Sequence, residues 1–116
     1  MVRKANIITK NSIRGGNGDV EFHYILSAEE LADHGRMFAR MVFKPGSCTK
    51  WHQHEDSKEI YYVLSGEGRY TDCDGSVHTI KAGDVCTAGY NHWHCVENLS
   101  ETENLEVIGL ILNEVK

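Results

Sequence analysis

The chain has 116 residues, a formal net charge of -5, and a composition that is 41% hydrophobic and 25% charged. This length predicts one domain over residues 1–116, built around a single core. The acidic balance argues against nucleic acid or an anionic membrane as a partner, because both bind basic surfaces. No apolar run approaches the roughly 20 residues of a membrane span, and the N-terminus lacks the apolar region of a signal peptide. We therefore expect a cytoplasmic protein.

Two short strands are expected in the N-terminal quarter, at residues 5–9 and 20–26, the second on the alternation of its side chains. Between them, residues 14–18 contain three glycines in five positions and predict a flexible or tightly turned loop. A phosphate-binding loop is disfavoured, because no strand–loop–helix context follows.

A short helix is expected next. Ser27 and Glu30 have the spacing of a capping box, which predicts a helix over about residues 28–33 that Gly35 ends. Residues 36–43 alternate in the manner of a strand, with Met, Ala, Met and Phe on one face.

The middle of the chain carries His52 and His54 one residue apart, with Glu59 five residues later. Residues two apart in a strand point to the same face, so both imidazoles can aim at one point. An apolar run over residues 59–65 predicts the next strand, folded back beside the first, which lets the Glu59 carboxylate reach that point. Two imidazoles and a carboxylate suit a divalent transition metal, and His94 offers a fourth ligand.

Strand parity predicts which way the side chains of several neighbouring residues point. Tyr61 falls on the metal-facing side of its strand. Its phenol could contact a substrate, or its ring could simply pack in the wall of a barrel. Trp51 and Trp93 each flank a metal ligand and are expected to face away from the metal. His92 matches no ligand position, and an exposed loop residue is the better interpretation.

The four cysteines, at positions 48, 73, 86 and 95, show no spacing typical of a zinc site. In a cytoplasmic protein we expect reduced thiols that are buried or half-buried. Cys48 shares strand parity with His52 and His54, so it would face the cavity if that strand began early enough.

Glycine and aspartate turns divide the rest of the chain into short strands, expected at residues 69–73, 76–80, 85–87, 92–98 and 105–112. Asp74-Gly75 is a strong hairpin signal. The last strand is almost continuously apolar, which predicts burial on both faces. Many short strands with one short helix predict an all-β sandwich or barrel.

The two histidine-bearing segments resemble the two motifs of a small single-domain cupin. The fixed positions of the first motif are filled by Gly46, His52, His54, Glu59 and Gly66, and those of the second by Gly83, His94 and Asn98. Gly89 stands where proline is usual and Asn91 where glycine is usual. The second exchange is mild, since asparagine tolerates the left-handed conformation.

The resemblance implies an all-β cupin fold, a double-stranded β-helix or jelly-roll barrel with one short helix near the N-terminus, and commonly a homodimer. It also implies that His52, His54, Glu59 and His94 bind one divalent transition metal per chain, which could be Mn, Fe, Ni, Co or Zn. Four protein ligands leave two positions on an octahedral ion. Those positions suit a small anionic or polyol ligand, such as a 2-oxo acid or an oxalate-like diacid.

Among small cupins the chain looks most like the oxalate-decarboxylase-like group. This likeness favours a metal-dependent enzyme acting on a small carboxylate, keto acid or sugar-like substrate. The class could be decarboxylase, dioxygenase, isomerase or lyase, with Tyr61 as the candidate catalytic residue. Because the sequence offers no unambiguous general base, a non-catalytic metal-dependent binding or sensing barrel is the alternative.

Overall fold

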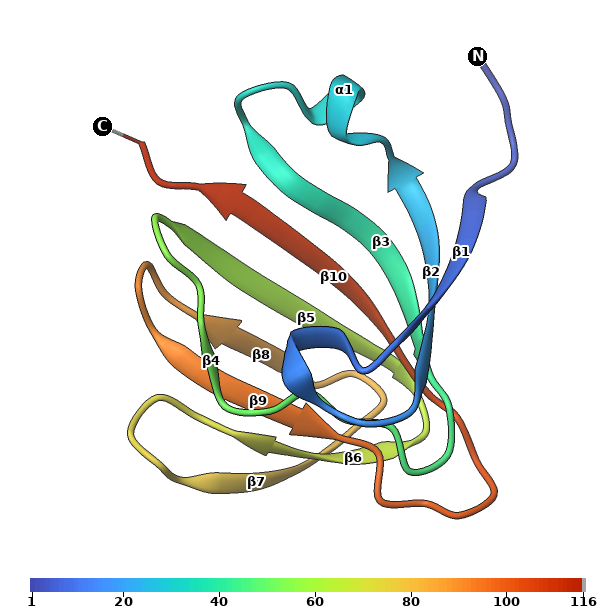
Figure 1. The fold of residues 1–116 in the computed structure, drawn as a ribbon, viewed down its shortest axis with the longest axis vertical. Coiled ribbons are helices and arrows are strands. Elements are labelled where there is room, and N and C mark those ends of the chain that lie inside the picture. Colours follow the sequence, from blue (N-terminus) through green and yellow to red (C-terminus); the bar gives the residue numbers. More distant parts are fainter. Residues whose placement is uncertain (116) are drawn as a thin grey trace.

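The computed structural model describes residues 1–115 and contains two antiparallel β-sheets (Figure 1). The larger sheet has six strands in the order β1 (Asn6–Asn11), β2 (Asp19–Leu26), β3 (Gly35–Phe43), β10 (Leu105–Asn113), β5 (Ser57–Ser65) and β8 (Val85–Ala88). The smaller sheet has four, in the order β4 (His52–Gln53), β9 (Trp93–Glu97), β6 (Glu67–Thr71) and β7 (Val77–Lys81). The predicted all-β architecture is confirmed.

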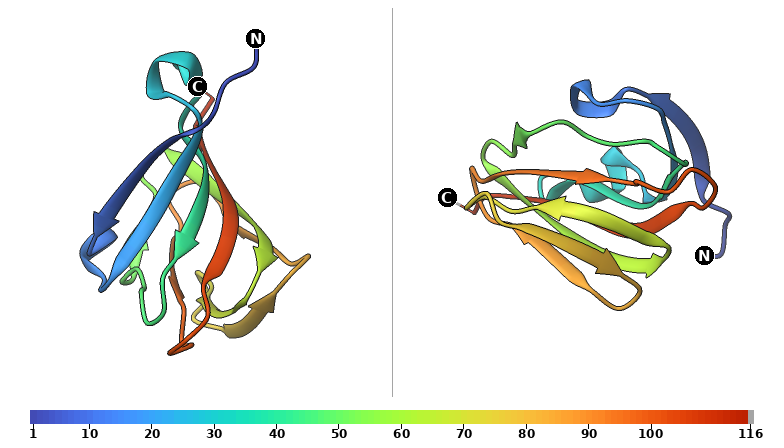
Figure 2. Two further views of the ribbon diagram at one scale, coloured as in Figure 1. Left: turned by 90° about the vertical axis from the view of Figure 1, so that its right-hand side faces the viewer. Right: turned by 90° about the horizontal axis from the view of Figure 1, so that it is seen from below.

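One hydrophobic core lies between the two sheets, whose arrangement Figure 2 shows from two further sides. Alternate residues of each strand point into this space, because successive side chains in a strand face opposite sides. The largest contributors are Val20, Phe22, Met41, Phe43, Tyr61, Val63, Tyr70, Ile80, Val96, Leu105 and Val107. In β3 the inward residues are those that the alternation predicted.

Strand β10 departs from the prediction of burial on both faces. Leu105, Val107, Gly109 and Ile111 are buried, but the residues that alternate with them are only half-buried. The reason lies in the two-sheet architecture: the larger sheet has a second sheet against its inner face only. The apolar side chains of Ile108 and Leu110 therefore lie on a partly solvated outer face.

The predicted helix is present but shorter than expected. Helix α1 (Ala28–Leu31) begins with the predicted capping box, in which the Ser27 hydroxyl accepts from the Glu30 N–H and the Glu30 carboxylate accepts from the Ser27 N–H. The expected end at Gly35 is wrong, because Ala32 adopts a φ of 51° and Gly35 already begins β3. Within residues 1–115, no helix is long and apolar enough to cross a membrane.

Three further boundaries differ from the sequence interpretation. The glycine-rich segment contains a 3₁₀ turn (Ile13–Gly15) where only a loop was expected. Strand β6 begins at Glu67, so the turn before it is tighter than predicted. Strand β4 is only two residues long, so His54 lies just beyond it.

Candidate metal centre

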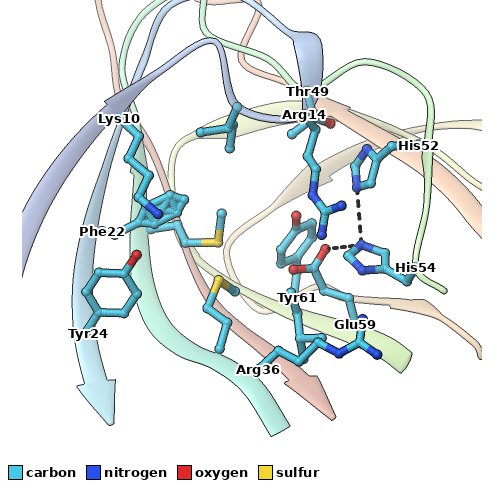
Figure 3. Close-up of a pocket in the computed structure, with 14 residues that line it drawn as sticks. Lys10, Arg14, Phe22, Tyr24, Arg36, Thr49, His52, His54, Glu59 and Tyr61 are labelled. Atoms are coloured by element: carbon cyan, nitrogen blue, oxygen red, sulfur yellow. Dashed lines mark hydrogen bonds and ion pairs between the residues drawn. The ribbon is translucent and has the colours of Figure 1, made fainter. Parts of the chain in front are cut away.

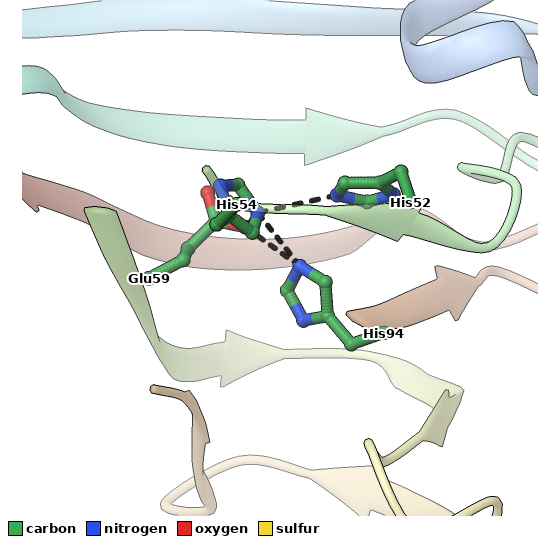
Figure 4. Close-up of side chains that lie close together, drawn as sticks. All are labelled: His52, His54, Glu59 and His94. Carbon is green, nitrogen blue, oxygen red and sulfur yellow. Dashed lines mark hydrogen bonds and ion pairs between the residues drawn. The ribbon is translucent and has the colours of Figure 1, made fainter. Parts of the chain in front are cut away.

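The four expected ligands meet at one point between the two sheets (Figure 4). The Nε2 atom of His54 lies 3.2 Å from that of His52 and 2.8 Å from that of His94. The Glu59 Oε1 atom lies 3.0 Å from His54 Nε2 and 3.2 Å from His94 Nε2. All four candidate ligand atoms fall within 4.8 Å of one another.

Strand pairing brings these residues together from distant parts of the chain. His52 of β4 lies directly opposite His94 of β9 in the antiparallel register. His54 lies beyond β4, yet its N–H donates to the His92 carbonyl at 3.1 Å and its carbonyl accepts from the Asn91 N–H at 2.9 Å. These bonds fix the backbone of His54, so its ring meets that of His52 even without a longer strand.

The outer nitrogens of two rings are held by neighbours. His52 Nδ1 lies 2.6 Å from the Lys50 carbonyl, which can only accept, so Nδ1 carries the proton and Nε2 presents its lone pair to the centre. His94 Nδ1 lies 2.8 Å from the buried Tyr70 hydroxyl. Partners of this kind orient the imidazoles of metal sites.

At the centre, the buried nitrogen and oxygen atoms that can accept a hydrogen bond outnumber the protons available to them. Glu59 Oε1 is within ion-pair distance of two rings but has no hydrogen-bond partner of normal geometry within the described residues. His54 Nε2 can carry at most one proton for its three close neighbours. A divalent cation would satisfy all four atoms at once, so the donor set fits a transition metal.

The protonation states also suit metal binding. Burial lowers the pKa of His52 to about 4, which keeps this ring neutral at neutral pH. Burial alone would raise the pKa of Glu59, but its close approach to His54 and His94 outweighs that effect and lowers it to about 2. Glu59 is therefore ionised, and metal need not displace a proton from either group at neutral pH.

Tyr61 is buried as expected from its parity, and its ring stacks on that of His94 with centroids 5.9 Å apart. Cys48 does not line the cavity, because β4 begins only at His52 and the early strand start on which a cavity-facing Cys48 depended is absent. The chain before β4 is not a regular strand, so parity does not carry back from His52, and Thr49 lines the cavity instead. The backbone of Cys48 exchanges two hydrogen bonds with that of Asn17, at 2.9 and 3.2 Å.

The remaining neighbours lie where the sequence placed them. His92 is an exposed loop residue, and its Nδ1 accepts from the Gly89 N–H at 3.2 Å. Trp51 and Trp93 face solvent and stack on each other, with ring centroids 6.3 Å apart. All four cysteines are free, as predicted, although Cys73 is exposed rather than buried.

A cavity of about 350 Å³ leads to His52, His54 and Glu59 (Figure 3). Its other walls include Lys10 of β1, Arg14 of the 3₁₀ turn and Arg36 of β3. Sequence reasoning did not identify these three cations. They lie outside both histidine motifs, and only the tertiary fold brings them to the cavity.

A family model described as the cupin domain matches residues 39–111, which include all four candidate ligands. This chain belongs to the cupin family. The matched segment also contains the second half of β3 and most of β10, two neighbouring strands of the larger sheet.

Relatives of this cupin share most of its length. It is 43% identical over 115 residues to an oxalate-binding protein of Thermotoga maritima, covering 97% of this chain and 93% of the relative. The crystal structure of a predicted oxalate decarboxylase from Thermotoga maritima superposes with a TM-score of 0.87 at 40% identity, covering 97% of this chain and 98% of the other. KdgF from a Halomonas species has a TM-score of 0.70 at 19% identity, covering 93% and 89% of the two chains, and supports the fold alone.

Proposed function

We propose that this cupin binds one divalent transition metal through His52, His54, Glu59 and His94, and uses it to bind a small chelating carboxylate. The observation that carries this proposal is the convergence of three imidazole nitrogens and the buried Glu59 carboxylate, whose four candidate ligand atoms all lie within 4.8 Å of one another. A divalent ion held there would supply Lewis acidity and a template for the ligand.

The choice of ligand follows from the coordination number and the surrounding charge. Four protein ligands leave two positions on an octahedral ion, and a bidentate carboxylate fills both while losing little extra association entropy. The cavity adds basic side chains, which favour an anion. A close relative is called an oxalate-binding protein, and oxalate has the chelating chemistry expected here.

Two measurements test this proposal. Elemental analysis should find one metal per chain in the wild type and a clear loss in His52→Ala and His94→Ala. Calorimetry should show oxalate binding to the metal-loaded protein at least about tenfold tighter than acetate, or about 1.4 kcal/mol, and no binding to the stripped protein. Undiminished metal in both variants, or oxalate binding that survives removal of the metal, would contradict the proposal.

The second candidate function is catalysis, with the bound carboxylate as the substrate. Tyr61 supports it, because this buried phenol lies in the cavity wall two residues after Glu59. We propose that Tyr61 contacts the bound carboxylate as a hydrogen-bond donor. If the protein is an enzyme, Tyr61→Phe should keep the metal content and lower kcat. If it is only a binder, product analysis of wild-type protein incubated with oxalate or a 2-oxo acid should show no turnover.

A further inference from the structure

The charge of the cavity is opposite to that of the protein. The whole chain has a net charge of -5, yet the cavity walls carry Lys10, Arg14 and Arg36 against the single carboxylate of Glu59. A bound divalent ion would make this space still more positive. Such a concentration of positive charge in an acidic protein favours a ligand with more than one negative charge.

Arg14 is the cation best placed to contact a ligand on the metal. Figure 3 shows its side chain extending into the cavity toward Glu59 and Tyr61. Its guanidinium makes no hydrogen bond or ion pair within residues 1–115. The other two cations are engaged: Lys10 lies over the Phe22 ring, 5.2 Å from the centroid, and Arg36 donates to the Asn113 side chain at 2.8 Å.

The glycine-rich segment holds Arg14 in this position. Arg14 has a φ of 51° and Ser12 a φ of 56°, both in the left-handed region that disfavours residues other than glycine. A Cβ atom at Gly16 would lie 1.8 Å from the Cys48 carbonyl oxygen, so only glycine lets the turn lie this close to the chain before β4. Backbone strain maintained by such packing is typical of functional positions.

We propose that Arg14 is the specificity-determining residue of the cavity and that it selects dicarboxylates. One oxygen from each carboxylate would coordinate the metal. The guanidinium would bind the second oxygen of each carboxylate, which faces away from the metal. The planar fork of arginine matches carboxylate oxygens in two parallel hydrogen bonds. This inference rests on the proposed function, and it assigns the glycine-rich segment a role in presenting Arg14.

Calorimetry on manganese-loaded protein tests the proposal with oxalate and pyruvate, a dianionic and a monoanionic chelator. Arg14→Gln should weaken oxalate binding at least about tenfold and pyruvate binding less than about threefold, because only oxalate keeps a second carboxylate for the guanidinium. Arg14→Lys should weaken oxalate binding by an intermediate factor, since it keeps the charge but loses the fork. Metal content after each titration should equal that of the wild type.

Lys10→Gln is the matched control, because it removes the same charge from the same cavity. It should weaken oxalate and pyruvate binding by similar factors, both smaller than the effect of Arg14→Gln on oxalate, because Lys10 adds positive charge to the cavity without contacting the ligand. The role of Arg14 would be overturned if Lys10→Gln and Arg14→Gln reduced oxalate affinity equally. It would also be overturned if Arg14→Gln weakened oxalate and pyruvate binding equally. Either result would leave metal-dependent binding of the ligand intact. Failure of the manganese-loaded wild type to bind oxalate would overturn both this inference and the proposed function.

Discussion

The hydroxyl of Tyr70 lies 2.8 Å from His94 Nδ1 and is buried with it. This contact crosses from β6 to β9 and sets the orientation of the His94 ring. A phenylalanine at position 70 would keep the packing of the ring but leave Nδ1 without its partner. Tyr70 is therefore a positioning residue for the candidate metal centre, although no motif in the sequence marks it.

We expect Tyr70→Phe to lower metal affinity about 10- to 100-fold, the usual effect of removing a partner of a ligating histidine. Competition with a fluorescent chelator would measure it. Tyr62→Phe is the control, because Tyr62 is exposed on the outer face of β5 and should leave affinity unchanged. Equal affinities in both variants would show that the hydroxyl does not orient the ring.

A second prediction at the residue scale concerns thiol reactivity. Burial raises the pKa of Cys86 to about 11, with smaller contributions from the negative charges of Asp84 and Asp72. Since the reactive form is the thiolate, the native protein at pH 8 should alkylate at the exposed Cys73 well before Cys86. The rate at Cys86 should rise about tenfold per pH unit between pH 8 and 10, because its thiolate fraction grows while the pH stays below the pKa. Mass spectrometry of quenched samples would follow both sites, and early labelling of Cys86 would contradict the assignment.

Among the secondary-structure elements, two motif positions have structural roles. The Asn98 amide donates to the carbonyls of Phe43, Lys44 and Glu103, at 2.9, 3.2 and 2.8 Å. These bonds join the end of β3 to the loop after β9. Gly66 lies between β5 and β6 with a φ of 83°, and a Cβ atom there would lie 2.2 Å from the Asn104 carbonyl oxygen.

We therefore expect Gly66→Ala to destabilise the protein much more than Gly75→Ala. Gly75 has the same φ of 83°, but a Cβ atom there would meet nothing within 4 Å. The left-handed conformation alone should cost about 1–2 kcal/mol at either site, and displacing the backbone near Gly66 should cost about 1–3 kcal/mol more. Urea unfolding of both variants, stripped of metal, would measure the difference. Equal losses of unfolding free energy in the two variants would mean that the turn at Gly66 can relax around the added methyl group.

The whole molecule should become more stable when it binds metal, because the four ligands converge only in the folded state. At a free metal concentration 100 times the dissociation constant, the gain should be about 2.7 kcal/mol. For a domain of this size, that raises the Tm by roughly 10 °C. Scanning calorimetry with and without a chelator would show the shift, and His94→Ala should lack it. An unchanged wild-type Tm would argue against a site formed by folding.

Three expectations about the whole molecule stay predictions. A single domain over residues 1–116 should unfold in one cooperative transition, since both sheets share one core. A homodimer should appear in light scattering at twice the mass of the 13.1 kDa chain. The cytoplasmic location requires localisation of the protein in cells.

The sequence by itself determined the fold class and the set of candidate ligands, because both depend on local spacing. Strand alternation and turn residues repeat along the chain, and His52, His54, Glu59 and His94 stand at the fixed positions of two short motifs. Parity also predicted the burial of Tyr61 correctly. It did not extend to Cys48, because parity holds only while the backbone stays extended and β4 begins only at His52.

Only the tertiary structure decided which residues surround the ligands. Arg14 lies 38 positions before His52 in the chain, and Tyr70 lies 24 positions before His94. These residues reach the cavity and the metal centre through sheet pairing and through a turn that packs closely against the chain before β4 only because Gly16 and Gly18 have no side chains. Such contacts depend on the path of the whole backbone, and local spacing carries no information about them.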